Sequence, residues 1–270
     1  MKRGLPILLA LLLVSCPCLF AEGESGKDQP VSLTHKFQAG QTVRYKIFQH
    51  ITGSRTFPGS DKPAPIDAEL RSVIRMRCDE VSRDGIATIS IELESGTLKI
   101  GKRQANAFIA GSVPRTLQVT SSGKVTFPPQ EQQDGDSSTR RVLMDAGAIE
   151  PLIILAGLPE QPIALGGSWS ADVVLPSLAK VKVASTLNEV KEVSGDQGAV
   201  ITQTQTTLGD SASPNRQEAK SKLIFGINTG RLLWAEGSIH SQVTTPGRGS
   251  ETAANSWVLD SKYTVEMLKG

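Results

Sequence analysis

Apolar and polar residues alternate along most of this chain, which is the pattern of β-strands that bury one face. The first alternating run covers residues 33–49, and a similar run near the other end covers residues 256–268. Further alternating runs lie between them, separated by turns rich in Gly, Asp and Ser. The pattern therefore predicts a mainly β (α+β) protein built on a curved antiparallel sheet or a half-open barrel.

The pair Asp84-Gly85 predicts the turn of a β-hairpin, because both residues tolerate positive φ angles. If these two residues form the loop, Arg77 lies opposite Glu92 on a charged face, and Cys78 falls on the other, apolar face. We therefore expect a solvated, charge-paired outer surface and a buried, unreactive Cys78 thiol. The alternative interpretation of the arginines on this strand is an anion-binding stripe.

A second hairpin is predicted at residues 117–127, where a three-residue loop ending in Gly123 pairs Val119 with Val125. Three features of the first half then recur in the same order in the second half. They are a strand opened by Gly, a hairpin turn with Asp and Gly, and a turn in which Ser or Thr precedes Gly and a basic residue. This order suggests a duplicated β-meander, residues 33–135 and 161–270, although turn chemistry alone also produces such echoes.

Residues 136–160 carry the one helical pattern in the body of the chain. N-cap residues open the segment, apolar residues then recur at helical spacing, and Pro151 predicts a kink or a fresh start. The apolar run is far shorter than the ~20 residues of a membrane span. We expect this segment either to close the core of the curved sheet or to line a ligand groove. The candidate groove-lining residues are Val142, Ile149, Leu152, Ile153 and Leu155.

The N-terminus has the basic start and the apolar run of a signal peptide, within residues 1–21. Two cleavage sites are open. Cleavage before Cys16, which follows a sequence similar to a bacterial lipobox, would make this cysteine the site of a lipid anchor. Cleavage after Ala21 would release an unmodified chain. Both interpretations predict an exported protein of the periplasm or cell envelope with a flexible leader at residues 22–32.

Charge and cysteine content exclude several classes of protein. The chain has 29 Lys and Arg against 27 Asp and Glu, and two of the basic residues lie in the signal peptide, so the mature chain is formally neutral. Neutrality argues against a general nucleic-acid binder and against a polybasic membrane surface. Cys78 is the only cysteine in the body of the fold, so the hydrophobic core and not a disulfide framework must stabilise it.

The sequence contains no recognisable catalytic motif. The three histidines, His35, His50 and His240, have no Cys, Asp or Glu at metal-ligand spacing. No phosphate-binding loop, metalloprotease motif or nucleophile elbow occurs. We therefore predict no metal, no cofactor and no enzymatic activity, with an unrecognised hydrolase as the remote alternative.

Three short motifs support a family resemblance: Gly-x-x-x-x-Tyr at residues 40–45, Pro-x-x-x-Gly-Gly-x-Trp at residues 162–169, and Thr-Gly-Arg-Leu at residues 229–232. With them the chain resembles exported bacterial β-rich proteins of the domain-of-unknown-function type. Its architecture is similar to that of periplasmic lipoprotein carriers. The resemblance implies a half-open antiparallel barrel with helices on its concave side, and the handling of lipid or lipoprotein. It implies no catalytic residue.

Together these observations predict a non-catalytic envelope protein that binds a lipid, a lipoprotein or another apolar ligand. The alternative is a structural or protein-interaction module of the envelope without a small-molecule ligand. No nucleic-acid partner is expected, and contact with the membrane is expected only through a lipid anchor at Cys16. The sequence does not identify the ligand.

Overall fold

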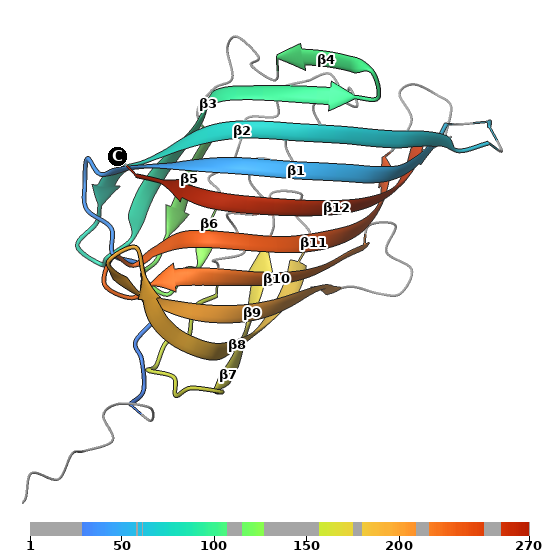
Figure 1. Cartoon of the computed structure of the whole chain (residues 1–270). Helices are drawn as coiled ribbons and strands as arrows, with labels where there is room; N and C mark the ends of the chain where they lie inside the picture. Colours follow the sequence, from blue (N-terminus) through green and yellow to red (C-terminus); the bar gives the residue numbers. More distant parts are fainter. Residues whose placement is uncertain are drawn as a thin grey trace, which may run out of the picture.

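The computed structural model describes residues 29–57, 59–60, 62–106, 115–126, 157–174, 180–208, 216–245 and 255–269. These residues form one antiparallel sheet of twelve strands (Figure 1). The strands are β1 (Thr42–Thr56), β2 (Ala64–Val81), β3 (Ala87–Ile100), β4 (Arg103–Asn106), β5 (Arg115–Val119), β6 (Val125–Thr126), β7 (Ser168–Val174), β8 (Lys180–Val193), β9 (Asp196–Leu208), β10 (Arg216–Gly226), β11 (Arg231–Thr245) and β12 (Asn255–Leu268).

The sheet is a meander that curls on itself. The strand order is β6-β5-β3-β2-β1-β12-β11-β10-β9-β8-β7, with β4 paired to β3. Among the described strands, the β1–β12 junction joins the two that are farthest apart in sequence. The long strands β2, β1, β12 and β11 lie at the front in Figure 1, while β5, β6 and β7 lie behind them. Since β6 and β7, at the two ends of the strand order, approach each other, the sheet forms a nearly closed barrel. The predicted curved antiparallel sheet is confirmed.

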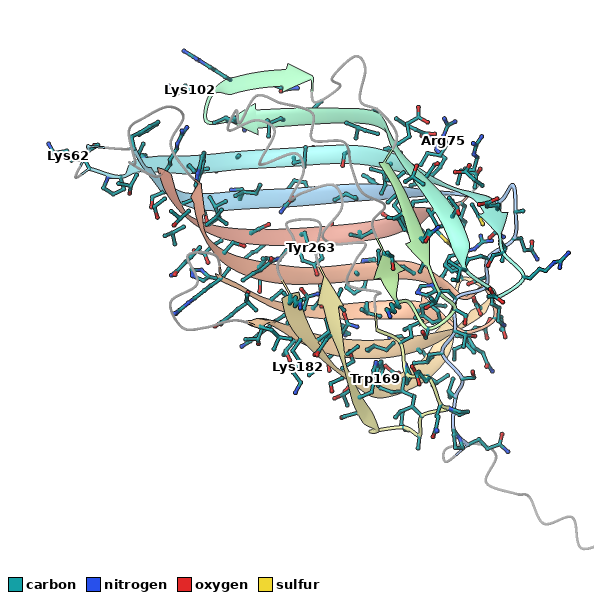
Figure 2. All side chains as sticks on the ribbon, turned by 180° about the vertical axis from the view of Figure 1, so that it is seen from behind. Lys62, Arg75, Lys102, Trp169, Lys182 and Tyr263 are labelled. Carbon is teal, nitrogen blue, oxygen red and sulfur yellow. The ribbon has the colours of Figure 1, made fainter. Side chains whose placement is uncertain are left out.

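Alternation decides which side chains fill the barrel. On β1, Tyr45, Ile47 and Ile51 point inward and are buried, and on β12 the inward positions include Tyr263 and Val265. From behind, Tyr263 is seen within the curve of the sheet (Figure 2). A main cluster fills most of the barrel, and a second, smaller cluster lies toward the far ends of β1, β2 and β12. The buried apolar area is the main stabilising contribution to the fold.

The register of the β2–β3 hairpin differs from the predicted one by two residues. Arg75 rather than Arg77 lies opposite Glu92, and Cys78 lies opposite Ile89. The loop spans residues 82–86 instead of two residues, and Asp79 is an unpaired bulge residue. Between Ile74 and Cys78, a shift of two residues keeps each side chain on its predicted face. The expected charge pairing of the outer face and the burial of Cys78 are therefore confirmed, although the predicted partners are wrong.

The second predicted hairpin is confirmed where it is described. Val119 pairs with Val125, and Gly123 has a φ of 80° in the three-residue loop between them. In the second half, the β8–β9 turn consists of Ser194 and Gly195, both with positive φ, rather than of the Asp and Gly that follow. Both predicted meanders contribute strands to the sheet, β1–β6 and β7–β12, and their origin by duplication stays a prediction.

Several predictions fall outside the described residues. They concern the signal peptide, Cys16, and most of the helical segment 136–160 with the candidate groove residues Val142, Ile149, Leu152, Ile153 and Leu155. The described residues contain no helix, and hence none long and apolar enough to cross a membrane. The described end of the predicted helical segment is extended along the β5–β6 turn, where the Leu158 N–H donates to the Ser122 carbonyl at 2.9 Å.

Asp196, the first residue of β9, stabilises the turn between β10 and β11. Its carboxylate accepts hydrogen bonds from the Asn228 N–H (3.0 Å), the Thr229 N–H (3.1 Å) and the Thr229 hydroxyl (2.7 Å). Burial acts to raise the pKa of Asp196, but these hydrogen bonds outweigh it and hold the pKa below its usual range. The charged form is therefore the one that the folded state favours.

We expect Asp196→Asn to reduce stability in a pH-dependent manner. The pKa of Asp196 is lower in the folded than in the unfolded chain, so its contribution is present above the ordinary aspartate pKa of about 4. It is lost as the pH falls through the lower, folded-state value. Above pH 5 we expect the free energy of unfolding of the variant to be about 1–3 kcal/mol lower than that of the wild-type protein, the range for hydrogen bonds to charged groups. Urea denaturation of both proteins from pH 7 to pH 3 should show this difference shrinking with acidity. A constant difference would contradict the assignment.

Candidate functional site

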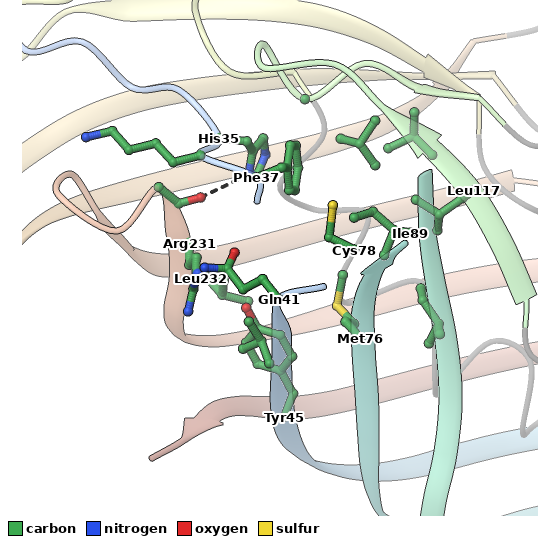
Figure 3. Close-up of a pocket in the computed structure, with 17 residues that line it drawn as sticks. His35, Phe37, Gln41, Tyr45, Met76, Cys78, Ile89, Leu117, Arg231 and Leu232 are labelled. Atoms are coloured by element: carbon green, nitrogen blue, oxygen red, sulfur yellow. Dashed lines mark hydrogen bonds between the residues drawn. The ribbon is translucent and has the colours of Figure 1, made fainter. Parts of the chain in front are cut away.

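A cavity of about 80 Å³ lies at the end of the barrel that carries the β2–β3, β5–β6 and β10–β11 turns (Figure 3). Most of its wall is apolar. Inward side chains of β3 and β5 form one side, namely Ile89, Ile91, Leu117 and Val119, and β1, β2, β6 and β11 supply the remaining strand positions. These side chains belong to the main core cluster, so the cavity is a gap within the core. Such a gap suits an apolar group.

The N-terminal strap, residues 31–41, crosses this end of the barrel. Its backbone is tied at three places. The Val31 N–H donates to the Ile163 carbonyl, the His35 N–H donates to the Ser121 carbonyl, and the Gly40 N–H donates to the Cys78 carbonyl, each at 2.8 Å. The strap therefore bridges the loop before β7, the β5–β6 turn and the end of β2.

Side chains anchor the strap to the core. Leu33 is completely buried, and His35 packs edge-on against Phe225 with ring centroids 5.5 Å apart. Phe37 stacks on His35 at 5.3 Å and lines the cavity. The strap thus forms one wall of the cavity in addition to crossing it.

The three motifs of the family resemblance meet at this end. Gly40 begins the approach to β1 and bonds to β2. Trp169 donates its Nε1–H to the Gly157 carbonyl at 2.6 Å, beside the β5–β6 turn. Gly230 has a φ of 66°, and a Cβ there would lie 2.4 Å from the Lys36 nitrogen, so glycine lets the strap pass over the β10–β11 turn. The motifs are therefore structural devices that shape the cavity end.

The cavity has polar groups along one side. Figure 3 shows Gln41, Tyr45 and Arg231 together, across from Met76, Cys78, Ile89 and Leu117. Burial raises the pKa of Tyr45, against the opposing effect of the nearby Arg231 charge, so the phenol stays protonated.

Cys78 and the histidines form no reactive arrangement. Burial, with a smaller effect of the Asp79 charge, raises the pKa of Cys78, so the thiol is favoured over the reactive thiolate. His35 belongs to the strap, whereas His50 and His240 bond to exposed aspartates, Asp67 and Asp260, on the outer face. In the described part of the chain, no three His, Cys, Asp or Glu side chains lie together as metal ligands would.

The site differs from the one that the sequence suggested. The candidate groove residues lie outside the described chain, so their role stays a prediction. The cavity consists mainly of strand residues that sequence analysis placed on the inner face of the sheet without marking them as a site. Their only sequence signal was the pair of glycine-containing motifs around Gly40 and Gly230.

No protein-family model and no curated protein matches the chain. Similar solved structures include one described as showing lipid–protein interactions in lipovitellin, with a TM-score of 0.46 and 12% identity. It is matched over 87% of this chain and 26% of its own, so the chain spans about a quarter of that protein.

Two other solved structures match at nearly full length. One is a LolA superfamily protein from Nitrosomonas europaea, with 10% identity, coverage of 87% of this chain and 90% of that one, and a TM-score of 0.16. The other is a DUF1329 family protein from Desulfovibrio piger, with 9% identity, coverage of 85% of each chain and a TM-score of 0.12. Both are of the kinds that the sequence resembles. With TM-scores below 0.5, these likenesses carry no argument about function.

Proposed function

We propose that this is an exported, non-catalytic binding protein that holds an apolar or amphiphilic ligand, such as a lipid, in the cavity beneath the N-terminal strap. The observation that carries the proposal is an apolar gap within the main core cluster, at the end of the barrel that the strap crosses. A merely structural module gains nothing from such a gap, because unfilled volume in a core reduces stability.

The size of the cavity limits what it accepts. Binding pockets for whole drug-sized ligands are usually about 300–1,000 Å³, whereas this one is about 80 Å³. It therefore accommodates a short apolar segment, such as the end of an acyl chain, while the rest of the ligand lies outside. A larger ligand would have to displace the strap, whose backbone is tied to the barrel mainly at three points.

The proposal includes export of the protein and, where cleavage precedes Cys16, its attachment to a membrane through that residue. The signal peptide directs the protein to the periplasm or cell envelope. Cleavage before Cys16 would tether it to a membrane through a lipid, and cleavage after Ala21 would leave it free. In both cases the leader joins the strap, so the cavity lies at the end of the barrel where the N-terminal segment is attached.

We expect Val119→Phe to weaken binding of oleate at least tenfold, because the larger ring occupies the cavity that Val119 lines. The matched control is Val183→Phe, which overpacks another inward position that does not line this cavity. Overpacking costs about 1–3 kcal/mol at either site, so unfolding curves must first show that both variants fold. Isothermal titration calorimetry then compares their oleate affinities. Equal loss in both variants, or failure of the wild-type protein to bind oleate, dioleoyl phosphatidate and oleyl alcohol alike, would overturn the proposal.

A further inference from the structure

Arg231 lies at the polar side of the cavity, where no described acidic side chain pairs with it. It is the first residue of β11, directly after Gly230, and its side chain lies beside Gln41 and Tyr45 (Figure 3). Within the described chain, its guanidinium makes no salt bridge. Its Nε atom is buried and has no hydrogen-bond partner. A buried charged donor without a partner is costly, so this position favours an incoming acceptor.

Among the described residues, the charged side chains that line the cavity are cationic. Lys36 and Arg231 line it, and none of the lining residues is Asp or Glu. Lys36 already donates to the Asn228 carbonyl at 3.1 Å. Asp196, the carboxylate that stabilises the adjacent turn, is occupied by hydrogen bonds from Asn228 and Thr229. Arg231 is therefore a cationic lining residue that has no salt-bridge partner among the described residues.

Tyr45 adds a neutral donor next to this charge. Its side chain is 4% exposed, and burial keeps the phenol protonated. A protonated phenol beside a guanidinium provides two kinds of donor to a single group of oxygens. Arginine also presents parallel N–H groups that match a carboxylate or a phosphate.

From this arrangement we infer that the ligand is an anionic amphiphile, whose acidic head binds Arg231 while its apolar chain enters the cavity. The inference rests on the proposed function and specifies its ligand class. A fatty acid and an acidic phospholipid share the chemistry that Arg231 would recognise, because both join an alkyl chain to an anionic oxygen group.

The test compares oleate with oleyl alcohol, which differ only in the head, and adds dioleoyl phosphatidate, which joins a phosphate head to two oleoyl chains. Wild-type protein is titrated by calorimetry with oleate, with dioleoyl phosphatidate and with oleyl alcohol, each below its aggregation concentration or in defined micelles. We expect oleate or the phosphatidate to bind at least tenfold more tightly than the alcohol. The better of the two acids identifies the carboxylate or the phosphate as the head. Equal affinities for acid and alcohol would overturn the inference and leave the proposed function standing. No binding of any of the three would overturn both.

Substitutions of Arg231 provide a second test of the inference. Arg231→Gln should reduce the affinity for the preferred acid about tenfold or more and leave the affinity for oleyl alcohol unchanged. Arg231→Lys should retain part of the acid preference, because the charge remains but the paired N–H groups do not. The control Lys36→Gln should change the acid affinity less than threefold, since Lys36 already bonds to Asn228. Equal weakening of acid and alcohol by Arg231→Gln would show a structural role and contradict the inference.

Discussion

Replacing Phe225 with alanine is expected to lower the free energy of unfolding by about 3–5 kcal/mol, the range for large aromatic truncations in a core. Phe225 lies on β10, has no exposed surface, and is among the largest fully buried side chains described. It also packs against His35 of the strap, so the truncation removes a contact that holds the strap to the barrel. Urea denaturation followed by circular dichroism measures the effect.

Phe57 provides the matched control for this substitution. It is 44% exposed at the end of β1 and contacts the Arg55 guanidinium at 4.2 Å. Such an exposed cation–π contact contributes about 0.5–1 kcal/mol, so Phe57→Ala should cost little more than that. If Phe225→Ala were as mild as Phe57→Ala, the barrel interior would not be packed as described.

Gly53→Ala is expected to destabilise the protein by about 2–5 kcal/mol, from backbone strain and overpacking together. Gly53 has a φ of 150°, and a Cβ there would lie 2.0 Å from the Val258 carbonyl oxygen on the neighbouring strand. A carbonyl in a strand cannot swing aside as a flexible side chain can. The substitution therefore acts on the junction between β1 and β12, where the first and last strands of the sheet meet.

Gly40→Ala is the control that measures backbone strain without a steric clash. Gly40 also has a positive φ, 80°, but a Cβ there would meet no atom within 4 Å. Its cost should be limited to about 1–2 kcal/mol for the left-handed conformation. In thermal unfolding, the unfolding temperature of Gly53→Ala should lie well below that of Gly40→Ala. Equal unfolding temperatures would argue against the close approach of β1 and β12.

The sequence predicted the local structure of the strands well, because alternation depends only on neighbouring residues. It placed Cys78 on the inner face and paired Val119 with Val125, and the structure agrees. It gave the wrong partners in the β2–β3 hairpin, because the five-residue loop and the bulge at Asp79 each shift the register by one residue. An extra residue of this kind is recognised only when both strands are seen together.

The cavity could not be predicted, because it depends on contacts between distant parts of the chain. Alternation shows that Leu117 and Ile89 point inward, but not that the space between them and Arg231 stays open. The strap forms the remaining wall. Position 230 requires glycine because Lys36 of the strap crosses it, and these two residues are almost 200 positions apart in sequence. In the sequence, Arg231 is only part of a turn motif, and the fold shows that no described acidic side chain pairs with it.

The most direct test of the central claim is native mass spectrometry of the purified protein with oleate, repeated after denaturation. The account predicts a species heavier by one oleate under native conditions, which Val119→Phe suppresses and denaturation removes. A protein that shows only its bare mass over a titration to saturating oleate, while Val119→Phe behaves identically, would contradict the claim that the cavity is a ligand site.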